Sequence, residues 1–460
     1  MDYSGRRVVI LGLARQGVAL ARYLAEQGAR VTVSDRQTAE QLSGALAALA
    51  GQPIEFVLGG HPESLLDEAD LLCLSGGVDA NLPLAVAARR RGLPLSNDSE
   101  IFLAACPTPH TVGITGSAGK TTTTTLVGRM LGAAGGPVWV GGNIGHPLIA
   151  DVGRMGPADR VVLELSSFQL EIMTRSPRVG ALLNLTPNHL DRHGTMDAYI
   201  SAKANLLRNQ AADGVAVLGW DDAQTRALAP LARGQVAWFS GAAEVAAGAC
   251  LRGEHLVWRW AGREHAICTV AEVQLRGRHN LLNVLAAGAA AGAALSLAGG
   301  APAAILPALR AGVLGFTGVE HRLELVREWQ GVRWYNDSIA SAPERVAAAL
   351  RSFDEPVVLL LGGRDKKLPW DELAAQIRGR VKHSVLFGEA GPLIERALTE
   401  AGVPAGQWTR CGPLRAAVAA AARQAARGEV VLLSPGCTSF DEFKDFAERG
   451  ERFKEWVRAL

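Results

Sequence analysis

Short apolar runs alternate with longer amphipathic stretches along the chain, and this pattern predicts a protein of the α/β class. Near the amino terminus, Val8–Leu11, Val31–Ser34 and Leu71–Leu74 are apolar runs of strand length, and Val18–Gln27 has the spacing of a helix. Strands that alternate with helices form βαβ units, in which the strands build a parallel sheet. The first part of the chain is therefore predicted to be a small parallel α/β domain.

The same alternation continues in two further blocks. In the second block, helical spacing occurs at Ala198–Asn209, and the strand-like runs are Thr111–Thr115, Val161–Leu165 and Val179–Leu185. In the third block, helical stretches separate the strand-like runs Val332–Tyr335, Val357–Leu361, Val385–Phe387 and Val430–Leu433. A chain of 460 residues is long enough for about three domains. We expect three α/β domains, at residues 1–97, 98–318 and 319–460.

One apolar segment is long enough to raise the question of a membrane span, because no charged residue occurs from Asn280 to Leu309. The segment consists mostly of Ala and Gly, and Pro302 and Pro307 interrupt it. A break at Gly299–Pro302 favours two packed, Ala-rich helices of a globular core. We therefore expect no membrane partner.

The composition excludes several classes of protein. Lys and Arg total 47 and Asp and Glu total 45, so the formal charge is only +2, which is not typical of a nucleic-acid or membrane-surface binder. The six cysteines form no CxxC pair, which argues against a zinc ribbon and is typical of a reducing compartment. The first residues show no signal-peptide pattern. We expect a cytoplasmic protein.

A glycine-rich loop with a lysine gives the strongest local signal for a ligand. The segment Thr115–Thr122 reads TGSAGKTT between a strand-like run and a helical stretch. Backbone N–H groups of such a loop can surround a phosphate, and the following helix directs its positive end at the same anion. The spacing departs from the usual pattern, because Ile114 stands where the first glycine is expected. The predicted phosphate-binding residues are Gly116, Ser117, Ala118, Gly119, Lys120, Thr121 and Thr122.

A second glycine loop follows the first strand-like run. Gly12–Gly17 has the pattern G-x-A-x-x-G, and Asp35 lies near the offset of about 20 residues that a ribose ligand would have. Ala14 occupies the position where a glycine allows close approach of a pyrophosphate, which weakens the case for a dinucleotide. The pattern fits a nucleotide-type ligand, and it also fits a turn that needs its glycines only for packing.

Acidic and imidazole side chains follow the strands after the phosphate loop. Glu164 ends a strand-like run, in the position of an acid that holds nucleotide-bound Mg²⁺. His189 and Asp191 follow the next run, and we expect His189 to lie near the metal. Lys203 by itself would be predicted to be a solvated lysine on a helix.

Further polar groups follow strand-like runs in the third block. Asp337 stands where ligands gather at strand ends in α/β sheets. Arg322 can bind a phosphate through two hydrogen bonds, although a surface arginine would look the same in sequence. The segment Gly362–Lys367 suits an anionic substrate, and it is also compatible with a solvated loop. The hydroxyl side chains of Ser434–Asp441 could pair with a carboxylate.

Taken together and in this order, the motifs resemble the Mur ligase family of ATP-dependent amide-bond-forming enzymes. The resemblance runs the whole length of the chain. Its segments are TGSAGKTT at 115–122, GGNIG at 141–145, ELSSFQLE at 164–171, NHLDRHG at 188–194, GRHNLLN at 277–283, HRLE at 321–324, NDS at 336–338 and SPGCTSFDEFKDF at 434–446.

The resemblance implies an N-terminal Rossmann-like domain for a UDP-sugar substrate, a central P-loop-type ATPase domain and a C-terminal Rossmann-like domain for an amino acid. It implies that ATP phosphorylates the carboxylate of UDP-N-acetylmuramoyl-L-alanine. D-Glutamate would then attack the acyl phosphate, in cytoplasmic synthesis of a peptidoglycan precursor for the cell wall. The chemistry consists of positioning and charge neutralisation. ATP and two Mg²⁺ ions are the implied cofactors.

The resemblance also implies roles for single residues. Lys120 and Thr121 would serve the ATP phosphates and the first Mg²⁺, while Glu164, His189 and a carbamylated Lys203 would hold metal. Lys120, Glu164, His189 and Lys203 are thus the expected catalytic residues. The implied ATP contacts are Asn280, Arg322 and Asp337. The implied contacts to the UDP-sugar are Asp35, Arg36, Ser75, Gly77 and Asn143. The implied contacts to glutamate are Ser341, Lys366, Ser439, Phe440 and Phe446.

Two departures from the family pattern leave the amino acid less certain than the reaction type. Ile339 and Ser341 replace the lysine and threonine of the family's NDSKAT segment. A sibling ligase that adds L-glutamate or another amino acid to a related UDP-muramoyl substrate remains the main alternative. A nucleotide-sensing module built on Gly12–Gly17 alone would leave Lys120 and Glu164 unexplained. We expect a monomer that binds small molecules and no nucleic acid.

Overall fold

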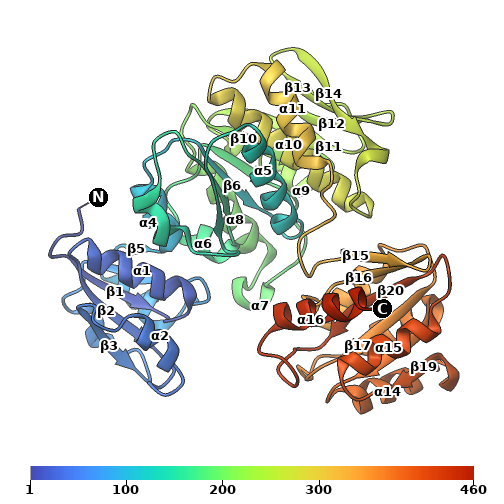
Figure 1. The fold of residues 1–460 in the computed structure, drawn as a ribbon. Coiled ribbons are helices and arrows are strands. Elements are labelled where there is room, and N and C mark those ends of the chain that lie inside the picture. Colours follow the sequence, from blue (N-terminus) through green and yellow to red (C-terminus); the bar gives the residue numbers. More distant parts are fainter. Residues whose placement is uncertain (1) are drawn as a thin grey trace. The chain divides into compact units, whose positions relative to one another are not determined.

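The computed structural model describes residues 2–460, and these residues form two compact units (Figure 1). The first unit runs up to Val273 and includes His279–Gly315, and the second comprises Gln274–Arg278 and Phe316–Leu460. Two sheets lie in the first unit and one lies in the second. The α/β class with three sheets is therefore confirmed, whereas the domain boundaries at residues 97 and 318 stay predictions.

The N-terminal sheet has five parallel strands in the order β3-β2-β1-β4-β5. Its strands are β1 (Arg7–Leu11), β2 (Arg30–Asp35), β3 (Ile54–Leu58), β4 (Leu71–Leu74) and β5 (Leu95–Ser96). Its helices are α1 (Arg15–Glu26), α2 (Ser43–Ala48), η1 (Glu63–Leu66), α3 (Pro83–Arg90) and α4 (Asp98–Ala105). Alternate residues of β1 enter opposite cores, Val8 and Ile10 on one face and Val9 and Leu11 on the other. Burial of both faces explains why β1 after Arg7 and the whole of β4 are continuous apolar runs.

The central sheet has nine strands in the order β14-β13-β12-β11-β10-β9-β6-β8-β7. The parallel strands are β6 (Thr111–Thr115), β7 (Val138–Gly142), β8 (Arg160–Glu164), β9 (Val179–Leu182), β10 (Val215–Gly219), β11 (Gln235–Ser240) and β12 (Gly248–Arg252). The antiparallel edge is formed by β13 (His255–Trp260) and β14 (Arg263–Thr269).

The helices that belong with the central sheet carry Lys120, Thr121, Thr122, Lys203 and Asn280 of the predicted site. They are α5 (Lys120–Ala133), η2 (Leu148–Arg154), α6 (Ser167–Ile172), α7 (Leu190–His193), α8 (Met196–Arg208), α9 (Ala223–Ala227), η3 (Ala229–Leu231), η4 (Val270–Glu272), α10 (Arg278–Leu297) and α11 (Pro302–Val313). Among the residues described, only α10 is long and apolar enough to span a membrane, and 67% of its most apolar window is buried inside the protein. The expected pair of packed helices with a break at Gly299–Pro302 is thus present as α10 and α11.

The C-terminal sheet has six strands in the order β15-β16-β20-β17-β18-β19, and only β15 is antiparallel to its neighbour. The strands are β15 (Glu324–Trp329), β16 (Val332–Asn336), β17 (Val357–Gly362), β18 (Val381–Phe387), β19 (Trp408–Arg410) and β20 (Val430–Gly436). The helices are α12 (Pro343–Leu350), α13 (Asp371–Arg380), α14 (Gly391–Glu400), η5 (Ala405–Gln407), α15 (Leu414–Gln424) and α16 (Phe446–Arg458). Helices α12, α13 and α14 share one core with this sheet, and α15 and α16 share the other.

The structure differs from the sequence-based prediction at the end of one strand and in the strands that no predicted run covers. Strand β9 ends at Leu182 rather than at residue 185, because the main chain of the next three residues bonds to the phosphate loop and to the Asp222 carboxylate. Strands β3, β5, β7, β10, β11, β12, β13, β14, β15 and β19 were not among the predicted runs. Charged side chains interrupt β14, so it forms no continuous apolar run, whereas Leu256, Val257 and Trp258 of β13 are consecutive buried apolar residues that the sequence reading passed over.

Candidate active site

The phosphate loop connects β6 to the first residue of α5, as the sequence predicts. Gly119 has a φ of +84°, and a Cβ atom there would lie 2.2 Å from Oδ1 of Asn283, so only glycine fits. Lys120 folds back over the loop, and its Nζ donates hydrogen bonds to the carbonyl oxygens of Gly116 (2.9 Å) and Ser117 (3.2 Å). The lysine charge, the loop amides and the start of α5 are therefore gathered in one place, which suits a phosphate group.

Side chains outside the motif hold this loop in shape. The N–H of Ala118 donates to Oδ1 of Asn184 at 2.9 Å, and Nδ2 of Asn184 donates to the Ala118 carbonyl at 3.1 Å. The hydroxyl groups of Ser117 and Tyr199 lie 2.9 Å apart. Sequence reasoning assigned no role to Asn184, Tyr199 or Asn283. The signal available for Asn184 was its position shortly after the end of β9.

Glu164 ends β8 beside the phosphate loop and is almost completely buried. Its Oε2 accepts a hydrogen bond from the Thr121 hydroxyl at 2.9 Å, and its Oε1 accepts one from Nδ2 of Asn143 at 3.0 Å. The sequence prediction placed Asn143 on the UDP-sugar side, and the structure places it against Glu164. A carboxylate and a hydroxyl oxygen side by side at a phosphate loop are ligands that suit Mg²⁺.

Lys203 on α8 lies with 1% of its surface exposed, so the expectation of a solvated lysine from the segment alone is wrong. Its Nζ donates a hydrogen bond to the Thr115 hydroxyl at 3.0 Å. Burial, followed by the nearby positive charge of Lys120, lowers the pKa of Lys203 well below its usual value. The amine is therefore favoured in its neutral, nucleophilic form.

His189 precedes α7 and has a left-handed backbone with a φ of +53°. Desolvation by its neighbours, followed by the charge of Lys120, lowers the pKa of its imidazole. A neutral imidazole can ligate a metal. The ring of Phe168, which lies on α6 shortly after Glu164, contacts the His189 ring edge-on at 5.0 Å between centroids. Asp191, in the same segment, is exposed.

A cavity of about 500 Å³ lies in the first unit, and Asp35, Arg36 and Gly77 are among its lining residues. These three residues were predicted to contact the UDP-sugar, and the structure brings them together. Both carboxylate oxygens of Asp35 accept backbone N–H groups, from Leu13 at 2.7 Å and from Gln37 at 2.9 Å. Asp35 thereby shapes the turn that follows β1. Ser75, the remaining predicted contact in this part of the chain, is buried.

The glycines of the turn after β1 have a packing role. A Cβ atom on Gly17 would lie 2.0 Å from the carbonyl oxygen of Gly12, so the helix packs on the turn only with glycine there. The turn also borders the cavity, because Gly12 is one of its lining residues. The two interpretations left open by the sequence, packing and ligand binding, are therefore compatible with each other.

Arg192 on α7 is a lining residue of the same cavity that sequence reasoning missed. Its Nε forms an ion pair with Oδ2 of Asp79 at 3.3 Å, and its NH1 donates to the Gly77 carbonyl at 3.4 Å. Its guanidinium also lies 4.6 Å from the centre of the Phe168 ring, the ring that contacts His189. Arg192 thus connects the cavity with the segment that carries the predicted metal ligand.

In the second unit, Arg322 lies between two residues with left-handed backbones, His321 (φ +62°) and Leu323 (φ +42°). Asp337 follows β16, and its Oδ1 accepts the Leu323 N–H at 3.2 Å. Its Oδ2 accepts the Ser434 hydroxyl at 2.8 Å. Burial raises the pKa of Asp337 from its ordinary value of 3.8 to about 7. The predicted nucleotide residues Arg322 and Asp337 are therefore held by one local network.

The remaining predicted residues fall into three groups. Nζ of Lys366 donates to the Ser341 hydroxyl at 3.0 Å, so the structure brings these two predicted glutamate contacts together. Ser439 is buried, whereas Phe440 and Phe446 are 59% and 39% exposed. Asn280 in the first unit accepts a hydrogen bond from Asn283 at 3.0 Å. Thr122 lies buried in α5. Their roles stay predictions.

Comparisons with known proteins agree with this arrangement of sheets and motifs. The MurD-like N-terminal domain of Mur ligases matches residues 6–96, the Mur ligase middle domain matches 114–291, and the Mur ligase glutamate ligase domain matches 321–437. The UDP-N-acetylmuramate-alanine ligase MurC of Thermotoga maritima has a similar fold, with a TM-score of 0.55, 20% identity and coverage of 98% of this chain and 99% of that chain.

Full-length relatives are more similar in sequence. The UDP-N-acetylmuramoylalanine–D-glutamate ligase of Symbiobacterium thermophilum is 45% identical over 457 residues, which cover 99% of this chain and 98% of that protein. The protein of the same name from Roseiflexus sp. is 43% identical over 479 residues, with 100% of both chains covered. The chain therefore belongs to the Mur ligase family, in the branch whose amino-terminal domain is MurD-like.

Proposed function

We propose that this protein is an ATP-dependent ligase that joins D-glutamate to UDP-N-acetylmuramoyl-L-alanine in the synthesis of a peptidoglycan precursor. The observation that carries the proposal is the association of Lys120, the Thr121–Glu164 pair and the buried Lys203 at one phosphate loop. Full-length identity to relatives that bear this activity in their name supports the choice of substrates.

ATP binding is assigned to the phosphate loop. The loop N–H groups and the start of α5 bind the phosphates, and the Lys120 ammonium neutralises negative charge as the γ-phosphoryl group moves. In the free protein the same ammonium bonds to two loop carbonyls, so it exchanges these partners for phosphate oxygens. Asn280, Arg322 and Asp337 are assigned to further contacts with ATP.

Two Mg²⁺ ions are proposed as cofactors, and the donor atoms present fit them. Thr121 and Glu164 offer a hydroxyl and a carboxylate oxygen, and His189 offers a neutral imidazole. The neutral amine of Lys203 can attack CO₂, forming an N–C bond and releasing one proton, to give an anionic carbamate as a further oxygen ligand. Bound there, the cations would stabilise the charge of the transferred phosphoryl group.

The amide bond is proposed to form in two steps. A carboxylate oxygen of the L-alanyl group attacks the γ-phosphorus of ATP, which yields an acyl phosphate and ADP. The amine of D-glutamate then attacks the acyl carbon, and the tetrahedral intermediate collapses with loss of phosphate and of the amine proton. Asp35, Arg36, Ser75, Gly77 and Asn143 are assigned to the UDP-sugar, and Ser341, Lys366, Ser439, Phe440 and Phe446 to glutamate. The pairing of Lys366 with Ser341 supports a polar site for an amino-acid carboxylate.

We further propose that the protein acts in the cytoplasm, where ATP and the UDP-linked substrate are available. A monomeric state is proposed as well. Light scattering of the purified protein, with and without substrates, tests the monomer.

The experiment that tests the function is phosphate release from ATP with Mg²⁺ and UDP-N-acetylmuramoyl-L-alanine across a panel of amino acids. Release that requires D-glutamate and yields the amide by mass spectrometry is the expected result. Release with L-glutamate instead would keep the reaction type and assign altered stereoselectivity to Ile339 and Ser341. Absence of release with every amino acid would contradict the ligase assignment.

A further inference from the structure

The backbone around Arg322 is held in an unusual conformation by its neighbours. His321 and Leu323 are both non-glycine residues with left-handed φ values, a conformation that persists only where surrounding contacts stabilise it. The Leu323 N–H is bonded to Asp337, as described above. The His321 N–H donates to Oε2 of Glu324 at 2.9 Å. Glu324 therefore stabilises one of the two strained residues directly.

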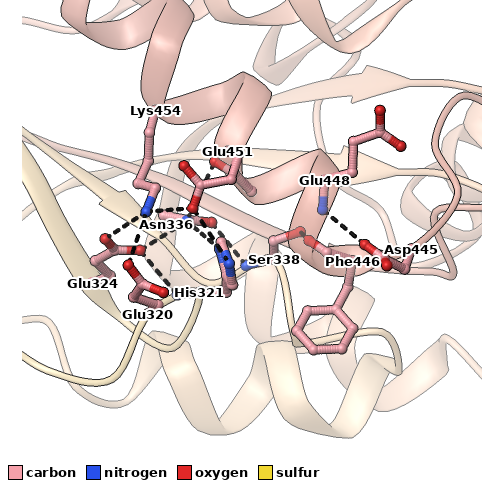
Figure 2. A network of polar contacts seen from close by, with 11 residues as sticks. Glu320, His321, Glu324, Asn336, Ser338, Asp445, Phe446, Glu448, Glu451 and Lys454 are labelled. Carbon is pink, nitrogen blue, oxygen red and sulfur yellow. Dashed lines mark hydrogen bonds and ion pairs between the residues drawn. The ribbon is translucent and has the colours of Figure 1, made fainter. Parts of the chain in front are cut away.

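The carboxylate of Glu324 is itself fixed on both oxygens (Figure 2). Its Oε2 also accepts a hydrogen bond from Nδ2 of Asn336 at 3.0 Å. The same amide nitrogen lies 3.0 Å from Nδ1 of His321, and since the amide can only donate, Nδ1 accepts. Desolvation lowers the pKa of His321. The other oxygen, Oε1, accepts from Nζ of Lys454 at 3.1 Å.

Lys454 extends from the last helix, α16, into this cluster, as Figure 2 shows. Only 4% of its side chain is exposed, and its Nζ lies 2.7 Å from Glu451, 3.1 Å from Glu324 and 3.7 Å from Glu320. Burial favours a neutral amine, but hydrogen bonds to Glu451 and Glu324 outweigh this effect and raise the pKa of Lys454. The side chain therefore stays an ammonium among three carboxylates.

Glu320, His321 and Glu451 also have the spacing of a metal-binding group. The ammonium of Lys454 already contacts both of these carboxylates, at 3.7 and 2.7 Å. A cation at the same place would be repelled by this ammonium, and nothing else in the cluster points to a metal. The cluster is better explained as a set of carboxylates organised by one lysine.

We propose that Lys454 is a positioning residue for Arg322, and that it acts through Glu324 and the backbone of His321. Loss of the ammonium leaves Glu320, Glu324 and Glu451 close together without a counter-charge, so they separate. Glu324 then leaves the His321 N–H, the left-handed backbone relaxes, and Arg322 no longer presents its guanidinium in one direction. This inference rests on the proposed function, because it assigns Arg322 to ATP.

The test compares four full-length variants in steady-state kinetics. Lys454→Met should raise the KM for ATP roughly tenfold, while the KM values for D-glutamate and the UDP-sugar change less than about twofold. Lys454→Arg should restore most of the ATP affinity, because it keeps the charge. Lys382→Met is the matched control, since Lys382 pairs with Glu429 at 2.8 Å in the same unit and touches none of these residues.

If Lys454 had only a structural role, its replacement would have a different effect. The melting temperature and the fraction of active enzyme would fall, so that kcat would decrease while all three KM values stayed unchanged. Equal rises in the three KM values, or an unchanged KM for ATP in folded Lys454→Met, would overturn the proposal. Glu451→Gln removes one partner of Lys454 and keeps Glu324, so only a small rise in the KM for ATP is expected. A large rise would also contradict the proposed action of Lys454 through Glu324. If the wild-type protein forms no amide at all, the proposed function fails instead, and the two failures are distinguishable.

Discussion

The side-chain nitrogen of Lys203 lies 3.0 Å from the hydroxyl oxygen of Thr115, the last residue of β6. The Thr115 hydroxyl donates its proton to the Leu165 carbonyl at 2.7 Å, so its oxygen is oriented to accept from the lysine. These two bonds join three elements at a buried amine: the end of β6, the residue after β8, and helix α8. Thr115 fixes the position of an amine whose pKa is lowered by burial.

Replacement of Lys203 by alanine should almost abolish ligase activity, because a carbamate on this residue is the proposed metal ligand. Short carboxylic acids such as formate or acetate should restore part of the rate, since their carboxylate can occupy the vacated space. The measurement is phosphate release with increasing acid concentration, and Lys120→Ala under the same acids is the control that should not recover. A folded Lys203→Ala protein that no carboxylic acid reactivates would count against the carbamate.

Replacement of Lys120 by alanine should lower kcat by more than about 100-fold, because the ammonium stabilises charge on the transferred phosphoryl group. Its bonds to the Gly116 and Ser117 carbonyls are lost as well, so the loop must be shown to stay folded. Thermal melting provides this control. Turnover close to that of the wild-type protein would remove Lys120 from the phosphate site.

The strands that could be predicted are mainly those buried on both faces of their sheet. Strands such as β1, β17 and β20 are continuous apolar runs that stand out in sequence, and their partners follow from the βαβ rule. Strands β3 and β14 were missed because exposed charged residues interrupt their apolar runs, as Glu55 does in β3 and Glu264 does in β14. The length of β9 was overestimated because Leu183 is as apolar as the strand but bonds to Thr115 beyond the strand's end.

Site residues could be predicted where a short continuous motif or a strand end identifies them, as at Lys120 and Glu164. Asn184 and Arg192 were missed because their roles depend on contacts with residues more than 60 positions away. The burial of Lys203 has the same origin, since the groups that desolvate it belong to other elements of the sheet. Spacing alone shows which face of a helix a lysine occupies but not what covers that face.

Arg192→Lys should weaken binding of the UDP-sugar and leave ATP binding close to normal. Lysine keeps the charge but cannot contact Asp79, the Gly77 carbonyl and the Phe168 ring together, because it lacks the planar guanidinium. We expect the dissociation constant for the UDP-sugar to rise about tenfold in calorimetric titration. Arg154→Lys is a control, since Arg154 lies outside the residues that line the cavity. An unchanged constant would mean that Arg192 only borders the cavity.

Lys366→Ala should raise the KM for glutamate more than the KM for ATP. The ammonium pairs with the Ser341 hydroxyl in the free protein and is proposed to bind a substrate carboxylate. Ser341→Ala keeps the charge and should show a smaller change in the same direction. If the KM for ATP rises more than that for glutamate, Lys366 belongs to the nucleotide site instead.

Asp337→Asn should make the protein more stable at pH 8 and change its stability little at pH 4. Burial raises the pKa of Asp337 from 3.8 to about 7, so between these values the folded state keeps a proton that the unfolded state has lost. Stability from this group is therefore lost as the pH rises, by an amount on the order of 4 kcal/mol above pH 7. Asparagine is uncharged at every pH, and it can still accept a hydrogen bond from Leu323 and donate one to Ser434.

Urea unfolding from pH 4 to 8 measures the difference in stability between Asp337→Asn and the wild-type protein. The exposed Asp354→Asn variant, which should follow the wild-type curve, is the control. A constant difference between Asp337→Asn and the wild-type protein across this range would show that Asp337 is ionised in the folded state.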